Sequence, residues 1–135
     1  MTAPVATAAG PTAQAAAAPA LSIGGLKTRA GFLRAAKGRR QAMPGFILQA
    51  RRRGADEPHV PAIRVGFTCS RKVGNAVRRN RAKRRLREVA RLVLPGEGRA
   101  GWDYVLIGRA GVTATREFGQ MQTDLRAALA RVHGA

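Results

Sequence analysis

The stretch IRVGFTCSRKVGNAVRRNRAKRRLREVARLVL, residues 63–94 of a chain of 135, contains the two clearest structural patterns in the sequence. Its first eight residues alternate between apolar and polar side chains, which is the period of a half-buried strand. The residues predicted to share the apolar face are Ile63, Val65, Phe67 and Cys69, with Arg64, Gly66, Thr68 and Ser70 on the other face.

The pattern changes to that of a helix between about Asn75 and Leu94. On a wheel of about 100° per residue, one side of this segment is apolar and the other is basic, as in an amphipathic helix. The apolar side holds Ala82, Leu86, Val89, Ala90 and Val93, and the polar side holds Asn80, Arg81, Lys83, Arg84, Arg87 and Arg91. Pro95 and the glycines after it are predicted to end the helix.

Positive charge is concentrated in the same stretch. Between Arg64 and Arg91 there are eleven basic residues and a single acid, Glu88. Like charges one helical turn apart disfavour an isolated helix by a few tenths of a kcal/mol per pair, so something outside the chain must compensate. The whole chain has 25 Lys+Arg and 7 Asp+Glu, a formal net charge of +18, which favours nucleic acid or an acidic membrane surface as partner.

The sequence also bounds the compartment and the domain organisation. There is no run of about 18 apolar residues and no pattern of a secretory signal, so we expect a cytoplasmic protein without membrane association. Residues 1–25 hold ten Ala, three Pro and no charge, which predicts a disordered Ala/Pro-rich tail. A single small folded domain is then expected over residues 26–135.

The rest of this domain follows from shorter patterns. A helix is predicted from a cap at Thr28 to Ala36, a strand over residues 45–50 and a second strand over residues 102–108. A last helix is predicted from a cap at Thr113 or Thr115 to about Ala130. The order α-β-β-α-β-α indicates an α+β sandwich, with helices packed on a small sheet.

No residues suggest that the protein itself carries out catalysis. His59 and His133 stand outside any motif, and the seven acids are scattered without the spacing of metal ligands. The only cysteine, Cys69, lies on the apolar face of its strand and is predicted to be a core thiol. We therefore expect no catalytic residue and no metal ligand.

One motif in the basic segment is specific. Gly74-Asn75-Ala76-Val77-x-Arg79-Asn80-Arg81-x-Lys83-Arg84 resembles the RNR motif of bacterial ribonuclease P protein subunits. The resemblance continues, in the same order, over nearly all of residues 26–130. It includes Leu26-Lys27 with Phe32, Phe46-Ile47-Leu48, and Asp103-Tyr104-Val105-Leu106-Ile107.

The resemblance implies a fold and a function. The fold is an α-β-β-β-α-β-α sandwich of the ribosomal protein S5 domain 2-like type, with a four-stranded sheet and a left-handed crossover that carries the RNR helix. This is one strand more than the periodicity predicts. The function is that of a subunit which assembles with a large catalytic RNA and requires no protein partner. The complex removes the 5′ leader of precursor tRNA by Mg²⁺-dependent hydrolysis, with Mg²⁺ bound mainly by the RNA.

The resemblance also implies two RNA-binding surfaces. The first contacts the catalytic RNA and consists of Arg71, Lys72, Asn75, Arg79, Asn80, Arg81, Lys83, Arg84 and Arg87. Arginine forks suit phosphate oxygens, and Asn80 is interpreted either as a contact to RNA or as a local cap. The second is a cleft for the 5′ leader, formed by Phe32, Ala36, Ile47, Gln49, Thr68 and Lys72.

The leader cleft departs from the family pattern at two positions. The family often has aromatic residues where this chain has Ala36 and Gln49, so stacking on the leader is expected to be weaker here. Phe32 is alternatively a residue of the core alone. For the whole protein, the alternatives are a structural, ribosomal-type RNA-binding protein without a processing role, and a DNA-binding module that uses residues 75–94 in a major groove.

Overall fold

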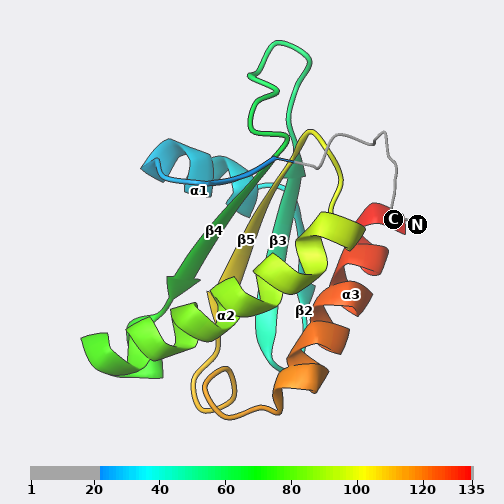
Figure 1. The fold of residues 1–135 in the computed structure, drawn as a ribbon. Helices are drawn as coiled ribbons and strands as arrows, with labels where there is room; N and C mark the ends of the chain where they lie inside the picture. The colour runs from blue at the N-terminus through cyan, green and yellow to red at the C-terminus, as the bar shows by residue number, and fades with distance from the viewer. Residues whose placement is uncertain (1–21, 135) are drawn as a thin grey trace, which may run out of the picture.

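The computed structural model describes residues 22–134, which form a five-stranded sheet with three helices (Figure 1). The strands are β1 (Ile23–Gly25), β2 (Arg39–Ala42), β3 (Phe46–Arg52), β4 (Ile63–Cys69) and β5 (Trp102–Gly108). The helices are α1 (Arg29–Ala36), α2 (Ala76–Glu97) and α3 (Phe118–Gly134), and a short 3-10 helix, η1 (Arg71–Val73), precedes α2. The predicted α+β class and the implied order α-β-β-β-α-β-α are confirmed from α1 onward.

The sheet has one strand more than the four implied by the resemblance. Its order is β1-β4-β5-β3-β2, with β4 parallel to both β1 and β5, and β3 antiparallel to β5 and β2. The extra strand, β1, pairs Ile23 with Ile63 and Gly25 with Val65.

The assignment of residues 1–25 to a tail is therefore wrong for Ile23–Gly25. From the sequence alone, Gly24 and Gly25 are interpreted as residues that interrupt regular structure. In the strand, Gly24 is required because a Cβ at this position would lie 2.5 Å from Cγ of Pro61. Residues 1–21, the rest of that predicted tail, lie outside the described residues.

The two faces of the sheet are covered unequally. Helices α2 and α3 lie across one face and enclose the main core, whereas α1 covers part of the other face (Figure 1). Fully buried members of the main core include Phe46, Leu48, Leu86, Val89, Val93, Tyr104, Leu106, Met121, Leu125 and Leu129. The apolar side predicted for the basic helix is thus its buried side, and α2 turns its basic side outward.

The connection from β4 through α2 to β5 is a left-handed crossover between adjacent parallel strands. In Figure 1 both strands run downward, α2 lies in front of them, and β5 lies to the right of β4. Such crossovers are nearly always right-handed, so the feature could come only from the resemblance and not from the residue pattern.

Three helix ends differ from the sequence-based prediction. Helix α2 continues through Pro95 to Glu97, since proline in the last turn removes a single hydrogen bond, and Gly98 then forms the cap. Helix α3 begins at Phe118 rather than at Thr113 or Thr115, and it ends at Gly134 rather than at about Ala130. Thr113 is fully buried and its hydroxyl donates to the Gly45 carbonyl at 2.7 Å, so it anchors the preceding loop instead of capping the helix.

Candidate nucleic-acid interface

The entrance to α2 is built by two residues with structural roles. Gly74 has φ +133°, a conformation that side chains rarely adopt, and a Cβ there would lie 2.7 Å from Cδ of Arg78. Asn75 is the N-cap, because its Oδ1 accepts the backbone N–H of Arg78 at 3.0 Å. The glycine and asparagine of the motif therefore fix where the helix starts. Asn75, predicted as an RNA contact, has its side-chain oxygen engaged in this cap.

The basic side of α2 faces solvent. Asn80, Arg81, Arg84 and Arg87 are exposed, and Arg79 and Lys83 are half-buried beside β4. Asn80 lies inside the helix, so the cap considered for it is supplied by Asn75 instead. Within residues 22–134, none of the cations in this set forms a salt bridge with an acid.

Arg87 has an additional contact that orients it. Its guanidinium lies 5.7 Å from the centre of the Phe67 ring on β4, which holds the charge at the edge of the sheet. Glu88, the single acid of the segment, is engaged with Arg91, and this hydrogen bond lowers the pKa of the Glu88 carboxyl. Nothing acidic in the described chain offsets the motif residues themselves.

Arg85 has a different role, although it belongs to the same basic run. Its guanidinium donates to the carbonyls of Thr113, at 2.8 Å, and Arg116, at 2.6 Å, and lies 5.9 Å from the Phe118 ring centre. Arg85 thus ties α2 to the loop between β5 and α3.

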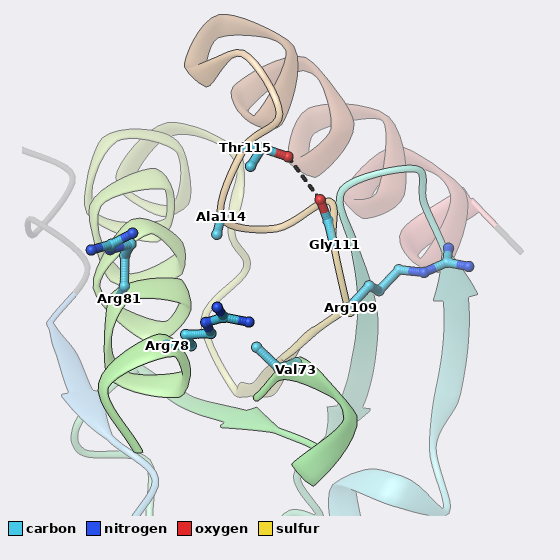
Figure 2. A pocket seen from close by; sticks show the side chains of 7 residues that line it. All are labelled: Val73, Arg78, Arg81, Arg109, Gly111, Ala114 and Thr115. Atoms are coloured by element: carbon cyan, nitrogen blue, oxygen red, sulfur yellow. Dashed lines mark hydrogen bonds between the residues drawn. The ribbon is translucent and has the colours of Figure 1, made fainter. Parts of the chain in front are cut away.

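A pocket of about 300 Å³ lies between the start of α2 and this loop, and Figure 2 shows the side chains around it. Arg78 points into the pocket from α2, while Arg109 extends away from it and donates to the Met43 carbonyl at 2.7 Å. The remaining lining residues are Val73, Arg81, Gly111, Ala114 and Thr115. No sequence pattern distinguishes Arg78, which occupies an unspecified position of the motif.

The predicted leader cleft lies on the sheet face that α1 partly covers. Ile47 pairs with Ile107, which pairs with Thr68, and Gln49 pairs with Val105, which pairs with Gly66. All of Ile47, Gln49 and Thr68 are half-buried. The structure therefore brings these three predicted residues onto one continuous surface.

Phe32 lies directly on this surface. A Cβ at Gly66 would lie 2.5 Å from Cζ of Phe32, so the glycine provides the space for the ring. Phe32 packs against a small cluster of Leu26, Ala35 and Val105 but stays half-buried, so one edge remains available to a ligand. Ala36 is exposed at the C-terminal end of α1, and Lys72 is exposed in η1, beyond the end of β4.

Beside this cleft, a buried carboxylate gathers arginines that the residue patterns did not identify. Asp103 accepts two hydrogen bonds from Arg64, at 2.8 and 2.7 Å, and lies 3.1 Å from Nε of Arg53. Arg51 lies 3.9 Å from Asp103 and binds Glu57 through both oxygens. The Asp103 hydrogen bond raises the pKa of Arg64, whereas burial lowers the pKa of Arg53.

Arg53 also organises the loop between β3 and β4. Its side chain donates to the carbonyls of Pro58, at 2.8 Å, and Pro61, at 3.0 Å. The pKa of Glu57 in this loop falls to about 2, chiefly through its hydrogen bonds with Arg51. These contacts hold the loop between β3 and β4 against the end of β3 and the start of β4. They therefore fix the border of the sheet face that α1 partly covers.

The remaining candidate groups for chemistry are separated from one another. His59 is exposed in the loop, and His133 lies near the end of α3, where Nε2 is 2.8 Å from the Tyr104 hydroxyl. Cys69 is half-buried, and burial raises the pKa of its thiol. Within residues 22–134, no three residues among His, Cys, Asp and Glu form a group able to hold a metal ion. None of the helices in this range has both the length and the apolar character needed to span a bilayer.

Comparison with known proteins identifies relatives over most of the chain. The family model for Ribonuclease P matches residues 24–133. The ribonuclease P protein component of Ruegeria pomeroyi is 61% identical over 108 residues, which cover 80% of this chain and 85% of the relative. That of Paramagnetospirillum magneticum is 52% identical over 108 residues, covering 79% and 80%.

Solved structures of RNase P proteins are also similar to this chain. The RNase P protein of Staphylococcus aureus matches with a TM-score of 0.61 and 30% identity over 80% of this chain and 95% of that chain. The RNase P protein of Thermotoga maritima matches with a TM-score of 0.61 and 29% identity, covering 77% and 92%. With its RNR motif on an exposed basic helix, its mixed sheet and these relatives, the chain belongs to the ribonuclease P protein family.

Proposed function

We propose that this protein is the protein subunit of ribonuclease P in the cytoplasm, where it binds the catalytic RNA through α2 and the 5′ leader of precursor tRNA through the α1 face of the sheet. The observation that carries the proposal is the exposed basic side of α2, without acidic partners in the described chain, in a member of this family. Such a surface repels itself until polyanionic RNA neutralises it.

The contacts to the catalytic RNA would be made mainly with phosphates. Arg81, Arg84 and Arg87 project from rigid helical positions, and each guanidinium can donate two parallel hydrogen bonds to a phosphate. The pocket beside Arg78 offers a place where one phosphate can enter between α2 and the loop after β5. The packed side of α2 fixes the spacing of these groups before RNA binds.

The leader would bind across Phe32, Ile47, Gln49 and Thr68. A single-stranded segment needs basic edges and flat side chains for stacking, and here one half-buried phenylalanine provides the aromatic surface. Stacking on the leader is therefore expected to contribute less than in relatives with more aromatic residues in this cleft.

The holoenzyme is an endoribonuclease, and in our proposal the RNA carries its chemistry and most of its Mg²⁺. Four of the seven acids are already neutralised by arginine: Glu57 by Arg51, Glu88 by Arg91, Asp103 by Arg64, and Asp124 by Arg116. A carboxylate engaged in this way is a poor ligand for a cation. The role of the protein is then to hold substrate and catalytic RNA together.

A reconstitution assay tests this function. The purified chain is added to a bacterial ribonuclease P RNA at low Mg²⁺, and removal of the leader from precursor tRNA is measured. We expect stimulation by the unaltered chain and by Arg126→Ala, an exposed position on α3, and much weaker stimulation by Arg81→Ala/Arg84→Ala. RNA binding without any stimulation of cleavage would instead support a structural RNA-binding protein.

A further inference from the structure

A second basic recess lies at the opposite end of the sheet from the start of α2. It has a volume of about 540 Å³ and forms where α3 ends and the sheet continues beyond it. Its lining includes Arg39 of β2, Arg52 of β3 and Trp102 of β5, together with Arg99 and His133. Neither predicted RNA-binding surface includes any of these residues.

The strand register shows how far this recess is from the other surfaces. Trp102 pairs with Ile63 at the start of β4, whereas α2 follows Cys69 at the end of β4. Seven residues of strand span roughly 20 Å, so the recess and the entrance to α2 are about that far apart. Trp102 alternates with Asp103 along β5 and faces the α3 side, so the aromatic part of the recess lies on the sheet face opposite the leader cleft. Lys37 at the end of α1 and Arg51 border the recess from the other side.

The recess is positively charged and has no acid in its lining. Two of its five Lys and Arg residues are already engaged: Arg51 binds Glu57, and Arg39 donates to the Val132 carbonyl while lying 5.9 Å from the Trp102 ring centre. Lys37, Arg52 and Arg99 are exposed and have no salt-bridge partner within residues 22–134. Three free cations around one recess favour an anionic ligand.

Aromatic groups stand beside these cations. Trp102 is half-buried, with the His133 ring edge-on at 4.6 Å and the Tyr104 ring behind it at 6.3 Å. Nε2 of His133 is hydrogen-bonded to the Tyr104 hydroxyl, which holds the imidazole ring beside Trp102. A flat aromatic surface and three cations are the groups that recognise a nucleotide, with its base and phosphate together.

We propose that this recess is a third RNA contact, which binds a single-stranded or looped nucleotide. The phosphate is held by Lys37, Arg52 and Arg99, and the base stacks beside Trp102 on the planar guanidinium of Arg39, which lies over the Trp102 ring. The proposal rests on the proposed function, because the partner is RNA, and it adds a contact on the sheet face that the leader does not use. An acidic protein segment would satisfy the cations but would leave the aromatic surface without a use.

Trp102 is the only tryptophan of the chain, so its fluorescence reports on this recess directly. The full chain is titrated with hexauridylate, a short RNA without structure of its own, and we expect saturable quenching of Trp102. Arg52→Ala/Arg99→Ala should weaken the apparent Kd about tenfold or more, because charged hydrogen bonds to phosphate are lost. The melting temperature should not change, since neither side chain has a hydrogen-bond partner in the described structure.

A control variant locates the effect. Arg126→Ala removes one charge from the exposed surface of α3, outside the recess, and its fluorescence should be quenched like that of the unaltered chain. The proposal is wrong if hexauridylate gives no saturable quenching, or if the Arg52→Ala/Arg99→Ala variant binds as well as the unaltered chain. Equal quenching by a hexaglutamate peptide would overturn it in favour of an acidic protein partner.

A parallel titration with ribonuclease P RNA separates this proposal from the proposed function. If the unaltered chain binds that RNA and Arg81→Ala/Arg84→Ala does not, the proposed function stands, whatever hexauridylate does at Trp102. If the unaltered chain does not bind ribonuclease P RNA, the proposed function fails. Saturable quenching that depends on Arg52 and Arg99 would then still establish the recess as a site for single-stranded RNA.

Discussion

Asp103 is the residue on which the arrangement of the β3, β4 and β5 ends depends most. Its carboxylate is buried and faces Arg64, Arg53 and Arg51, so removing it leaves buried positive charge without a partner. We expect Asp103→Ala to lower the free energy of unfolding by about 3–5 kcal/mol. Urea denaturation measures this, with Asp56→Ala, an exposed acid in the adjacent loop, as the control. Equal stability of the two variants would show that the arginines are solvated without Asp103.

The stability of the loop between β3 and β4 depends on pH through Glu57. The pKa of Glu57 is lowered from 4.5 to about 2 by its hydrogen bonds with Arg51, so the folded state binds a proton less readily there than the unfolded state. The stabilisation is fully present above pH 4.5 and is lost as the pH falls towards 2. Glu57→Gln should therefore be less stable than the unaltered chain at pH 6, and the difference should shrink as the pH falls towards 2. If the difference in stability between the two proteins did not change with pH, it would come from packing and not from the charge of Glu57.

The roles of single residues in the basic helix could be predicted from the sequence only in part. The RNR motif includes Gly74 and Asn75, and the geometry explains both as the entry and cap of α2. The motif includes Arg81 and ends before Arg85, but it gives no role for Arg85. Only the tertiary contacts of Arg85 with the carbonyls of Thr113 and Arg116 distinguish a structural arginine from one that faces solvent.

Within helix α2, Arg81 and Arg85 should respond differently to substitution, because only Arg85 has tertiary contacts with the loop after β5. Arg81→Ala should leave the melting temperature unchanged and lower the log–log salt slope of RNA binding by roughly 0.7–0.9, the effect of losing one phosphate contact. Arg85→Ala removes the same charge but frees the loop after β5, so it should lower the melting temperature. Leu86→Ala, at a fully buried position, should cost about 2–5 kcal/mol and keep the salt slope. A lower melting temperature for Arg81→Ala with an intact slope would place that side chain inside the protein.

Long elements were predictable, and short edge strands were not. The segments that became β3, β4, β5 and the three helices carry their own periodic apolar residues, which the core uses directly. Strand β2 is Arg-Arg-Gln-Ala, mostly exposed, and β1 contains two glycines. Both are held by backbone pairing with a neighbouring strand, β3 for β2 and β4 for β1, and side-chain patterns do not record that pairing.

For the whole molecule, the charge of +18 is distributed over separate surfaces. The basic side of α2 lies at one end of the sheet, and the recess around Trp102 lies at the other end. The leader cleft lies on the sheet face that α1 partly covers, opposite the face covered by α2 and α3. On that face Asp103 neutralises part of the neighbouring arginine charge. A small domain can therefore touch an RNA of much larger size at several points, while the cleft stays open to a different RNA segment.

The last prediction uses this separation of surfaces. Ala36 is exposed on α1, four residues after Phe32, so an aromatic side chain there would extend the stacking surface of the leader cleft without disturbing a buried contact. A stacked base contributes about 1–3 kcal/mol, so the holoenzyme with Ala36→Phe should bind precursor tRNA more tightly by up to that amount. Mature tRNA lacks the leader, and its affinity should stay the same.

The measurement is the ratio of the Kd for mature tRNA to the Kd for precursor tRNA, with Gln120→Phe on the exposed start of α3 as the control. The control adds the same apolar ring outside the cleft and should leave the ratio unchanged, because nonspecific stickiness acts on both ligands alike. If Ala36→Phe tightened the binding of both tRNAs equally, the gain could not come from the leader. The α1 face would then lose its assignment as the leader cleft, while the assignment of α2 to the catalytic RNA would be unaffected, since it depends on different residues at the end of β4.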